Sequence, residues 1–505
     1  MYGRSEKQLQ HKVSQNMDSL HAESKKKGKT ELPISYLDES KKENLSVPLT
    51  SVHLLKSYYE SKLMCKQSSS TPSTSSISYK ELSTDGILKL ARERLLQCTT
   101  PNFDVVPLVL SDLFYTNSGV SSEKNEDFEL ALLLQAAALK FSDQQLGRAR
   151  KLLNICLTSA SLTGNALHRI VYYYSVALQE RITREIGGLV VPREPEENQR
   201  KPTVEEALTI LQPALLECQN EIPFSQVTKF TSIQAIMDNV ASAKRVHFVD
   251  LGIKSGSHWP ILMQALAGRH ECPLELLRIS AVGLSKETID KTGKTLSSFA
   301  DAMNIPFAFK LIVSDLKDLK EDFFELASDE VLAVYSEIRL SSLLPWPHHL
   351  ESLLRTIAKL NPCVMVITEP EANTSTPVFL DRFDAALSLC STIFDCLEDC
   401  MHRDNPCRNV IEGVFIWEAI RNVITTEGEE RIHRKQKLDF WRAFLARVGI
   451  VEIGLSDLAW CQSNLVVKSN PRWSSCTVEA NGKGMIIGWK GTPIQSLSVW
   501  KFHHE

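Results

Sequence analysis

The fold class that the sequence predicts is α/β, with a mostly parallel sheet that follows a block of helices. Three observations support this prediction. Residues 246–250 form an apolar run that ends in Asp250, and glycines at positions 252 and 256 then lead into a helical pattern from Trp259 to Ala267. A buried parallel strand needs a continuous apolar run, and a tight turn into a helix needs glycine. Further apolar runs alternate with helical patterns downstream, whereas the residues upstream carry helical spacing alone.

Composition sets the broad class of protein. The chain has 505 residues, of which 43% are hydrophobic and 23% are charged, and its formal net charge is −4. This length suggests roughly two to four domains or sub-domains, and the charge gives no overall basic field for nucleic acid. No apolar run approaches the roughly 18 residues of a membrane span, and the N-terminal residues lack the apolar stretch of a secretory signal. We therefore expect no membrane partner.

The N-terminal region is polar and of low complexity. We expect residues 1–80 to form a disordered tail, because they offer too little apolar surface to offset the entropy lost on ordering. Residues 81–126 are expected to form a short helical segment and a linker. A lysine cluster in the tail is a candidate nuclear import signal, and the alternative is a solvated charge cluster. The lysines are Lys25, Lys26, Lys27 and Lys29.

Residues 127–243 predict a leucine-rich helical cap, because apolar residues recur there at i, i+3, i+4 and i+7. Leucines on such faces are candidates for partner binding or dimerisation, as in a coiled coil. Short helices broken by turns more often pack their leucines on each other, which would make the same residues internal core. The candidates are Leu130, Leu133, Leu134 and Ala137 on one helix and Leu152 and Leu153 on the next.

Residues 244–505 predict an α/β core of the methyltransferase-like Rossmann type with a mixed sheet. Helical patterns over 259–267, 286–302 and 350–359 separate five candidate strands, which is typical of a parallel sheet. Two more helical stretches, over 378–396 and 435–448, follow. The parallel strands are expected at Val246–Asp250, Leu274–Val282, Phe307–Val313, Val331–Tyr335 and Cys363–Glu369, and the antiparallel C-terminal strands at Val451–Leu455, Asn464–Ser469, Met485–Trp489 and Gln495–Phe502.

A methyltransferase of this fold needs a glycine-rich loop after the first strand and an acidic residue at the end of the second strand to bind the ribose. Here Lys254 stands where the middle glycine would be, and the second strand ends without a carboxylate. No nucleophile elbow, P-loop or zinc-protease helix is present either. We therefore predict no catalytic residue, no cofactor and no small-molecule substrate. Cys396, Cys400 and Cys407 have no zinc-knuckle spacing and are interpreted as ordinary helical cysteines.

A run of basic residues is the best candidate for contact with nucleic acid. It consists of Arg431, Arg434, Lys435 and Lys437, and we expect its second half to begin a helix. Exposed cations bind phosphates without reading sequence. Three glutamates precede the run and would repel phosphate, so an ordinary charged helix face is the alternative interpretation.

Several conspicuous residues are expected to serve the fold. Asp250 ends a buried strand and is interpreted as a cap for the following turn. His247 is expected to be a core histidine with a hydrogen-bond partner. The tryptophans Trp259, Trp489 and Trp500 are expected to pack in the core, as are the leucines of two Leu-x-x-Leu-Leu strings, over 340–344 and 350–354.

The run Val246, His247, Phe248, Val249 and Asp250 resembles the Val-His-Ile-Ile-Asp signature of the plant GRAS family. The resemblance extends from about residue 127 to residue 505, with the family's segments in the right order. The C-terminal half looks most like the DELLA-related and scarecrow-like branch, although the tail contains no Asp-Glu-Leu-Leu-Ala segment. The other matching segments are Ser232–Ile236, Gly256–Pro260, Leu266–Arg269, Arg382–Phe383, Gly488–Lys490 and Ser498–Trp500.

The resemblance implies a nuclear transcriptional regulator that is not an enzyme. Proteins of this family associate with other GRAS proteins, as homodimers or heterodimers, and with DNA-binding transcription factors, so contact with promoter DNA is expected to be indirect. Hormone signalling, development and arbuscular mycorrhizal symbiosis are the processes that it suggests. Two alternatives remain at this point: a factor that binds DNA directly and, more remotely, a methyltransferase that uses S-adenosylmethionine.

Overall fold

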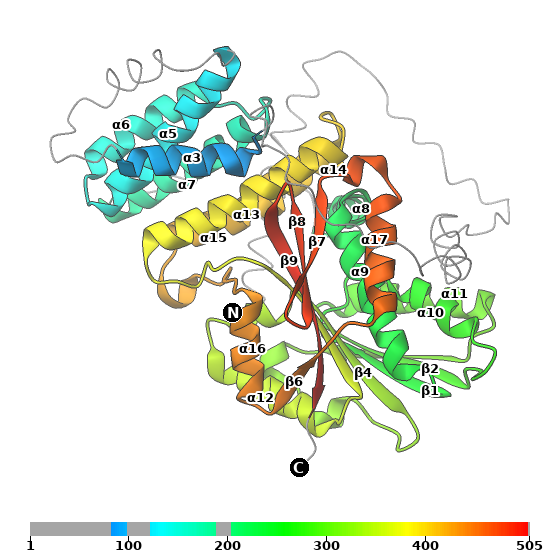
Figure 1. The fold of residues 1–505 in the computed structure, drawn as a ribbon. Coiled ribbons are helices and arrows are strands. Elements are labelled where there is room, and N and C mark those ends of the chain that lie inside the picture. The colour runs from blue at the N-terminus through cyan, green and yellow to red at the C-terminus, as the bar shows by residue number, and fades with distance from the viewer. Residues whose placement is uncertain (1–81, 98–121, 188–203, 503–505) are drawn as a thin grey trace.

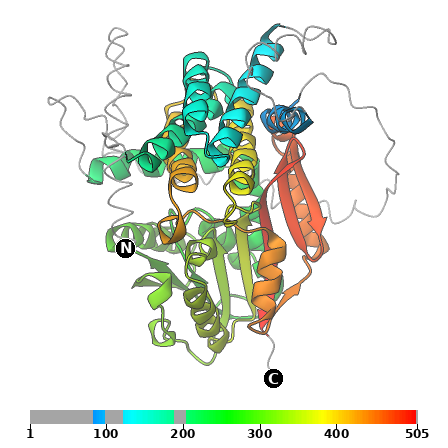
Figure 2. The ribbon, with the colours of Figure 1, turned by 90° about the vertical axis from the view of Figure 1, so that its left-hand side faces the viewer.

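The computed structural model describes residues 82–97, 122–187 and 204–502. The expected disordered tail and its lysine cluster lie outside these residues. Within them the chain forms a helical bundle above a twisted sheet (Figure 1), and the view turned by 90° shows the C-terminal strands rising along one side of the molecule toward the bundle (Figure 2). None of the helices in the described ranges is long and apolar enough to cross a membrane.

The helical bundle is built mainly from the N-terminal half. Asn165 caps its last helix by accepting a hydrogen bond from the backbone N–H of His168 at 3.0 Å, which is the usual role of asparagine at a helix start. Two helices from the C-terminal half, Phe379–Cys400 and Trp417–Thr425, pack against the same bundle. The bundle helices are α3 (Thr84–Gln97), α5 (Ser122–Ser142), α6 (Leu146–Ser159) and α7 (Ala166–Glu185).

The helix α3 lies outside the region that resembles the known family but is tied firmly to it. The backbone N–H and the hydroxyl of Thr84 donate to the two carboxylate oxygens of Asp395, at 2.8 and 2.5 Å. The hydroxyl of Thr492 donates to Asp85 at 2.6 Å. These contacts join the first described helix to segments more than 300 residues away in sequence.

The sheet has nine strands, and eight of them run in the order β3-β2-β1-β4-β5-β9-β8-β7, while β6 pairs with the far end of β9. The first five are parallel and the last four antiparallel. The strands are β1 (Arg245–Asp250), β2 (Leu276–Gly283), β3 (Phe307–Val313), β4 (Val331–Glu337), β5 (Val364–Pro370), β6 (Ile450–Ile453), β7 (Cys476–Asn481), β8 (Gly484–Trp489) and β9 (Thr492–Phe502).

Helices cover both faces of this sheet, so successive residues of a strand enter different cores. Phe248 belongs to the same apolar cluster as Leu134 of the bundle, whereas Val249 belongs to a second cluster with Leu353 and Trp441 on the opposite face. The bundle and one face of the sheet therefore share a continuous core. The remaining helices are α8 (Val204–Glu221), α9 (Pro223–Val240), α10 (Trp259–Ala267), α11 (Lys286–Ala302), α12 (Pro347–Lys359), α13 (Phe379–Cys400), α14 (Pro406–Val410), α15 (Trp417–Thr425), α16 (Leu438–Ala446) and α17 (Asp457–Lys468), with a π-helical turn at Ile411–Ile416.

The predicted α/β class with a methyltransferase-like mixed sheet and a helical cap is confirmed, with three local corrections. The strand expected at Asn464–Ser469 is wrong, because those residues form the last turns of α17 and its C-terminal end. The strand β7 was not predicted. The helix expected over 435–448 begins only at Leu438, so the basic run before it is not helical.

Candidate functional site

The signature strand β1 places its residues inside the fold. Val246, Phe248 and Val249 are fully buried between the two layers of helices. The carboxylate of Asp250 accepts hydrogen bonds from the backbone N–H of Gly252 and from the indole of Trp259, both at 3.0 Å. Asp250 thus ties the turn after β1 to the first residue of α10, as expected for a capping residue.

His247 is buried in the sheet, with a hydrogen-bond partner on one side of its ring and a nearby carboxylate on the other. Its Nε2 lies 2.8 Å from the hydroxyl of Ser280, and its Nδ1 lies 3.3 Å from the carboxylate of Glu330. Burial, with the positive charges of Arg278 and Lys310, lowers the pKa of His247 to about 4. The imidazole is therefore neutral at pH 7 and serves the core, as predicted.

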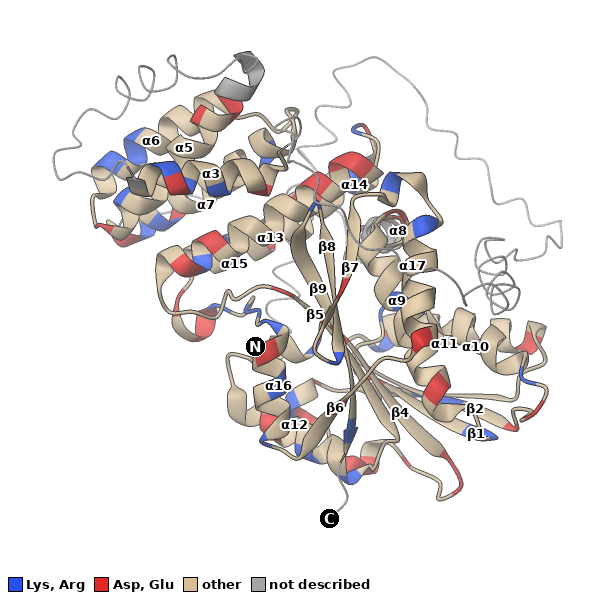
Figure 3. Ribbon diagram, in the orientation of Figure 1, with Lys and Arg blue, Asp and Glu red and all other residues tan. Residues whose placement is uncertain are grey.

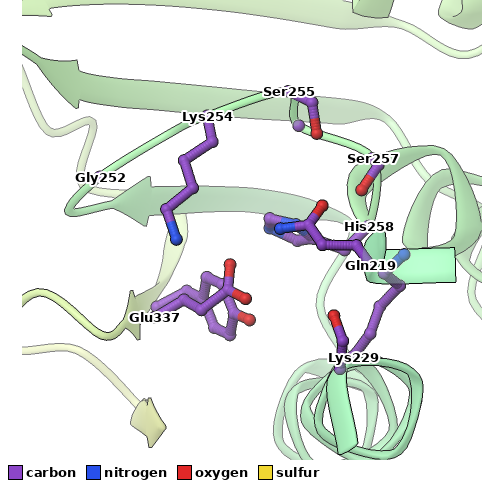
Figure 4. A pocket seen from close by; sticks show the side chains of 11 residues that line it. Gln219, Lys229, Gly252, Lys254, Ser255, Ser257, His258 and Glu337 are labelled. Carbon is purple, nitrogen blue, oxygen red and sulfur yellow. The ribbon is translucent and has the colours of Figure 1, made fainter. Parts of the chain in front are cut away.

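The carboxyl ends of β1 and β4 border a small hollow, where a methyltransferase of this fold would seat its cofactor. We call it the carboxyl-edge hollow. Its volume is ≈ 10 Å³, about the space of one water molecule, whereas small-molecule sites usually measure roughly 300–1,000 Å³. Figure 4 shows its side chains. They are Gln219, Ser225, Lys229, Gly252, Lys254, Ser255, Gly256, Ser257, His258, Tyr335 and Glu337.

Side chains of the protein itself fill the space beside the loop after β1. A Cβ atom on Gly252 would lie 2.4 Å from the side chain of Arg339, so the arginine occupies the space beside the glycine. Lys254 is exposed and reaches over the hollow. The end of β2, at Gly283, carries no carboxylate for a ribose. This edge does not fit an adenosyl cofactor.

The leucine face predicted as a partner or dimer candidate lies in the interior of the bundle. Leu133 is the only one of these candidates that is partly buried and so near the surface, and it still packs against the core. The interior position agrees with the internal-core interpretation of these residues. The candidates that are buried within this chain are Leu130, Leu134, Ala137, Leu152 and Leu153.

The basic run lies in a loop between α15 and α16, not on a helix. The guanidinium of Arg431 is buried and donates to the backbone carbonyls of Thr376 and Ser375, and burial lowers its pKa to about 10. Arg434 donates to the carbonyl of Gly428. Acidic and basic residues are also interspersed along the bundle helices (Figure 3).

The two lysines of the same run differ in their surroundings. Burial lowers the pKa of Lys435, and the carboxylate of Glu369 acts in the opposite direction. Its ammonium also reaches the hydroxyl of Ser341 at 3.4 Å. Lys437 is exposed to solvent. Of the four candidates for nucleic acid, the loop therefore leaves Arg434 and Lys437 closest to solvent.

Sequence reasoning missed a set of buried charges that joins the bundle to the C-terminal half. Arg169 of α7 makes a bidentate pair with Glu412 at 2.8 and 3.2 Å and contacts Glu398 of α13 at 2.8 Å. Arg408 of α14 also bonds Glu412, at 2.9 Å, and Glu398. We call Arg169, Glu398, Arg408 and Glu412 the α7 charge network. These residues are up to 243 positions apart, so local patterns carry no signal for the network.

The network controls the ionisation of Glu398. Burial alone would raise its pKa, but the hydrogen bonds and charges of Arg408 and Arg169 lower it to about 2. Glu398 is therefore ionised at neutral pH, and both arginines keep a charged partner. A similar pair, Arg421 of α15 with Glu180 of α7, lies further along the same helix at 2.7 Å.

The cysteines that the sequence brought together are not arranged for metal in the structure. The sulfur atoms of Cys396 and Cys400 lie 4.0 Å apart within α13, and the thiol of Cys407 donates to Glu217. Over the described ranges, no group of three or more His, Cys, Asp or Glu side chains is placed to hold a metal ion.

Comparisons with known proteins agree with the signature in β1. The GRAS domain family matches residues 130–501. DELLA protein RGL3 of Arabidopsis thaliana is 32% identical over 379 residues, which are 74% of this chain and 69% of that protein. DELLA protein GAI1 of Vitis vinifera is 30% identical over 378 residues, or 74% of this chain and 61% of that protein.

The crystal structure of SCL7 from Oryza sativa aligns with a TM-score of 0.62 and 25% identity, over 70% of this chain and 94% of that one. The overall fold thus recurs in a solved protein of similar sequence. The resemblance inferred from residues 246–250 and the segments around them is confirmed: the chain belongs to the GRAS domain family.

Proposed function

We propose that the chain is a nuclear transcriptional regulator that acts by binding other proteins and does not catalyse a reaction. Its partners are other GRAS proteins, as homodimers or heterodimers, and DNA-binding transcription factors, which bring it to promoters. Membership of the GRAS family and the similarity to DELLA proteins support this proposal. Hormone signalling, development and arbuscular mycorrhizal symbiosis are the processes in which we would look for its targets.

The carboxyl-edge hollow is the observation that carries the non-enzymatic part of the proposal. A space of ≈ 10 Å³ between Lys254 and Glu337 holds a water molecule and not a nucleoside. A fold that lacks the chemistry of its site does not carry the function of that site. What the chain offers to partners is then its outer surface.

Recruitment of the full chain to a promoter tests the regulatory role. Fused to a heterologous DNA-binding domain, the chain should change expression of a reporter gene several-fold in plant cells, upward or downward. Capture of bound proteins from nuclei should recover GRAS proteins and transcription factors. An unchanged reporter together with an empty capture would contradict the proposal.

A methyltransferase would behave differently in a thermal test. S-adenosylmethionine at 100 times its dissociation constant would stabilise the folded chain by about 2.7 kcal/mol. We expect no shift of the unfolding temperature at millimolar cofactor. A clear upward shift would favour the enzyme over the adaptor.

The leucine face is tested by a double substitution. Leu133→Asp with Leu134→Asp introduces two carboxylates, one of them at a fully buried position, so the bundle should unfold and self-association should disappear. Light scattering measures assembly, and circular dichroism measures helix content. A double variant that stays folded and still associates would show that this face is irrelevant to assembly.

Direct binding of DNA would depend on the two solvent-facing cations of the basic run. We expect the purified chain to bind promoter DNA no more tightly than unrelated DNA. The contrary result would be sequence-specific binding by the unchanged chain that the double variant Arg434→Glu with Lys437→Glu loses. It would replace indirect contact with promoter DNA by direct contact. Phosphate contacts by these residues would also appear as a steep dependence on salt.

Nuclear import is tested in the tail. Lys25, Lys26, Lys27 and Lys29 lie outside the described residues, and we propose that they bind an import receptor through their charge. Alanine at all four positions should lower the nuclear fraction of a fluorescent fusion. An unchanged distribution would leave these lysines as a solvated charge cluster.

A further inference from the structure

The helix α3 fills a groove whose walls come mostly from the matched family region. It packs against α5 and α13, and its first turn reaches the turn between β8 and β9 at Thr492 (Figure 2). We call the surface of α5, α13 and Thr492 that α3 covers the α3 groove. The helix itself lies upstream of residues 130–501, which match the GRAS family. The groove therefore belongs to the family domain, whereas the helix in it does not.

One face of α3 enters the groove with side chains at regular helical spacing. Leu88 and Ala91 are buried in the core cluster that also contains Leu134 of α5, and Leu95 is partly buried against the same cluster. Counted from Thr84, the three apolar residues stand at i+4, i+7 and i+11. This is the spacing by which an amphipathic helix binds a groove on another protein.

Polar contacts fix both ends of α3. At its amino end, the backbone N–H and the hydroxyl of Thr84 donate to the carboxylate of Asp395. Eight residues further on, the guanidinium of Arg92 lies 3.1 Å from the carboxylate of Asp384. The α3 groove thus offers one carboxylate to the start of a bound helix and a second one to a cation near its other end.

The covalent connections of α3 allow it to leave the groove. The chain on either side of the helix, residues 1–81 and 98–121, lies outside the described residues. Residues 98–121 join α3 to α5, and a fully extended chain of this length reaches about 80 Å. The 21 residues of α5 are only about 32 Å long. The helix α3 can therefore move clear of the groove without displacing α5.

An empty α3 groove would still favour a helix with the same features. Asp395 is only 5% exposed, and burial raises its pKa, an effect that the donors of Thr84 oppose. Without α3 this carboxylate would lose both donors, and a carboxylate that is left without them destabilises the chain. The apolar floor around Leu134 would be exposed to water at the same time.

We propose that the α3 groove is a binding site for an amphipathic helix of a partner protein, and that α3 occupies the site until the partner helix displaces it. That helix has apolar side chains at the spacing of Leu88, Ala91 and Leu95, a hydroxyl donor at its start and a cation eight residues later. The inference rests on the proposed function, in which the chain acts by binding proteins, and it names the surface that binds them. The tether keeps α3 at an effective concentration on the order of mM, so only a tightly binding helix replaces it.

A fluorescent peptide with the sequence of residues 82–97 is the probe for the site. In the full chain, Leu88→Asp with Ala91→Asp should detach α3 and leave the groove open. This variant should bind the probe roughly ten times more tightly than the unchanged chain, or better, because α3 no longer competes. Glu93→Asp with Arg94→Asp, at exposed positions of the same helix, is the matched control and should bind as weakly as the unchanged chain. Fluorescence anisotropy measures binding, and equal affinities of all three chains would overturn the proposal.

The polar contact at the start of the helix is tested by two further changes in the chain with detached α3. Thr84→Val in the probe should weaken binding about tenfold, since it removes a hydrogen bond to a carboxylate. When the chain also carries Asp395→Asn, the same change in the probe should matter much less. An equal loss in both chains would show that the probe binds outside the α3 groove.

Hydrogen exchange of the unchanged chain tests the release of α3 without any substitution. The backbone N–H groups of α3 should exchange about tenfold faster than those of α5 and α13, or faster still, because α3 opens locally while the bundle stays folded. If the N–H groups of α3 exchange only when the whole chain unfolds, α3 is a permanent part of the bundle and the proposal is wrong.

Capture of bound proteins from nuclei separates this proposal from the proposed function. The chain with detached α3 should recover several-fold more partner protein than the unchanged chain, and Asp395→Asn should reduce that gain. Equal recovery of GRAS proteins and transcription factors by all variants would refute the groove and leave the regulatory role intact. An empty capture by every variant would instead contradict the regulatory role, while binding of the probe still decides whether the groove accepts a helix.

Discussion

The α7 charge network buries two arginines and the carboxyl-edge hollow buries one lysine, Lys229, but only the network surrounds its cations with carboxylates. In the network, Arg169 and Arg408 share Glu398 and Glu412 through short hydrogen bonds. In the hollow, Lys229 has a single carboxylate at a distance and shares it with Lys254. The comparison separates two settings of buried charge: a paired set joins two layers of the fold, whereas Lys229 lies at the edge of the sheet with no ion-pair partner among the described residues.

The largest effect is expected from removing one carboxylate of the network. Glu412→Gln keeps the shape of the side chain but leaves Arg169 and Arg408 with one carboxylate, the half-buried Glu398, instead of two, which should lower the free energy of unfolding by about 3–5 kcal/mol. Urea unfolding followed by tryptophan fluorescence measures the loss. Glu351→Gln, in an exposed pair with Arg355, is the matched control and should leave the midpoint unchanged. A loss in Glu412→Gln no larger than in the control would mean that the network does not hold the layers.

The next largest effect is a dependence of stability on pH, which distinguishes His247 in the sheet from the α7 charge network. The pKa of His247 falls from 6.5 to about 4 on folding. As the pH decreases, His247 therefore binds a proton in the unfolded chain before it does so in the folded chain. Stability is then complete above pH 6.5 and declines as the pH falls through about 4, by about 3 kcal/mol. Unfolding measured between pH 7 and pH 4 should show this decline, and His247→Gln should flatten it.

The network should respond in a lower pH window. The pKa of Glu398 falls from 4.5 to about 2, so its contribution is present above pH 4.5 and is lost as the pH decreases toward 2. A decline confined to this lower window, even in the unchanged chain, would contradict the assignment of His247.

A smaller effect separates the two lysines of the basic run. Lys435→Met removes the cation that faces the buried carboxylate of Glu369, and we expect a loss of about 1–3 kcal/mol. Lys437→Met changes an exposed residue and should stay within about 0.5 kcal/mol of the unchanged chain. Equal losses of stability in the two variants would show that Lys435 and Lys437 contribute equally to the folded state.

The smallest effect has the opposite sign. Lys229→Met replaces a largely buried charge that has no ion-pair partner among the described residues with an apolar side chain of similar length, and it should stabilise the chain by about 1 kcal/mol. Lys254→Met, at the exposed mouth of the hollow, should change stability little. Destabilisation by Lys229→Met would show that Lys229 contributes to stability as the paired charges of the network do.

The contrast between the two regions also explains which parts of the fold and of the candidate site could be predicted from the sequence. The strand at 246–250 and the helix at 259–267 were predictable, because apolar runs, glycines and helical spacing act over a few residues. The filled cofactor edge could be predicted in outline, since Lys254 and the missing carboxylate after β2 are visible in the sequence. The short apolar run within Asn464–Ser469 fits a strand and a helix equally well, and the packing of α17 against α9 decides it.

Contacts that depend on distant segments gave no local signal. Arg169 and Glu412 look like ordinary surface charges in the sequence, and only the fold places them together. Arg431 looked like a phosphate ligand, yet the loop turns its guanidinium toward carbonyls at 375 and 376. Lys229 sits in a helix of mixed polarity, and its isolation becomes visible only when α9 is seen over the sheet.

The attachment of α3 has a practical consequence for anyone who shortens this chain. A fragment cut at the start of the matched family region would lose Thr84 and Asp85, leaving the buried carboxylate of Asp395 without its two donors and Thr492 without its acceptor. The smallest piece that keeps every layer closed must therefore begin upstream of residue 84. Boundaries set by the family match alone would remove α3 and expose the surfaces of α5 and α13 that it covers.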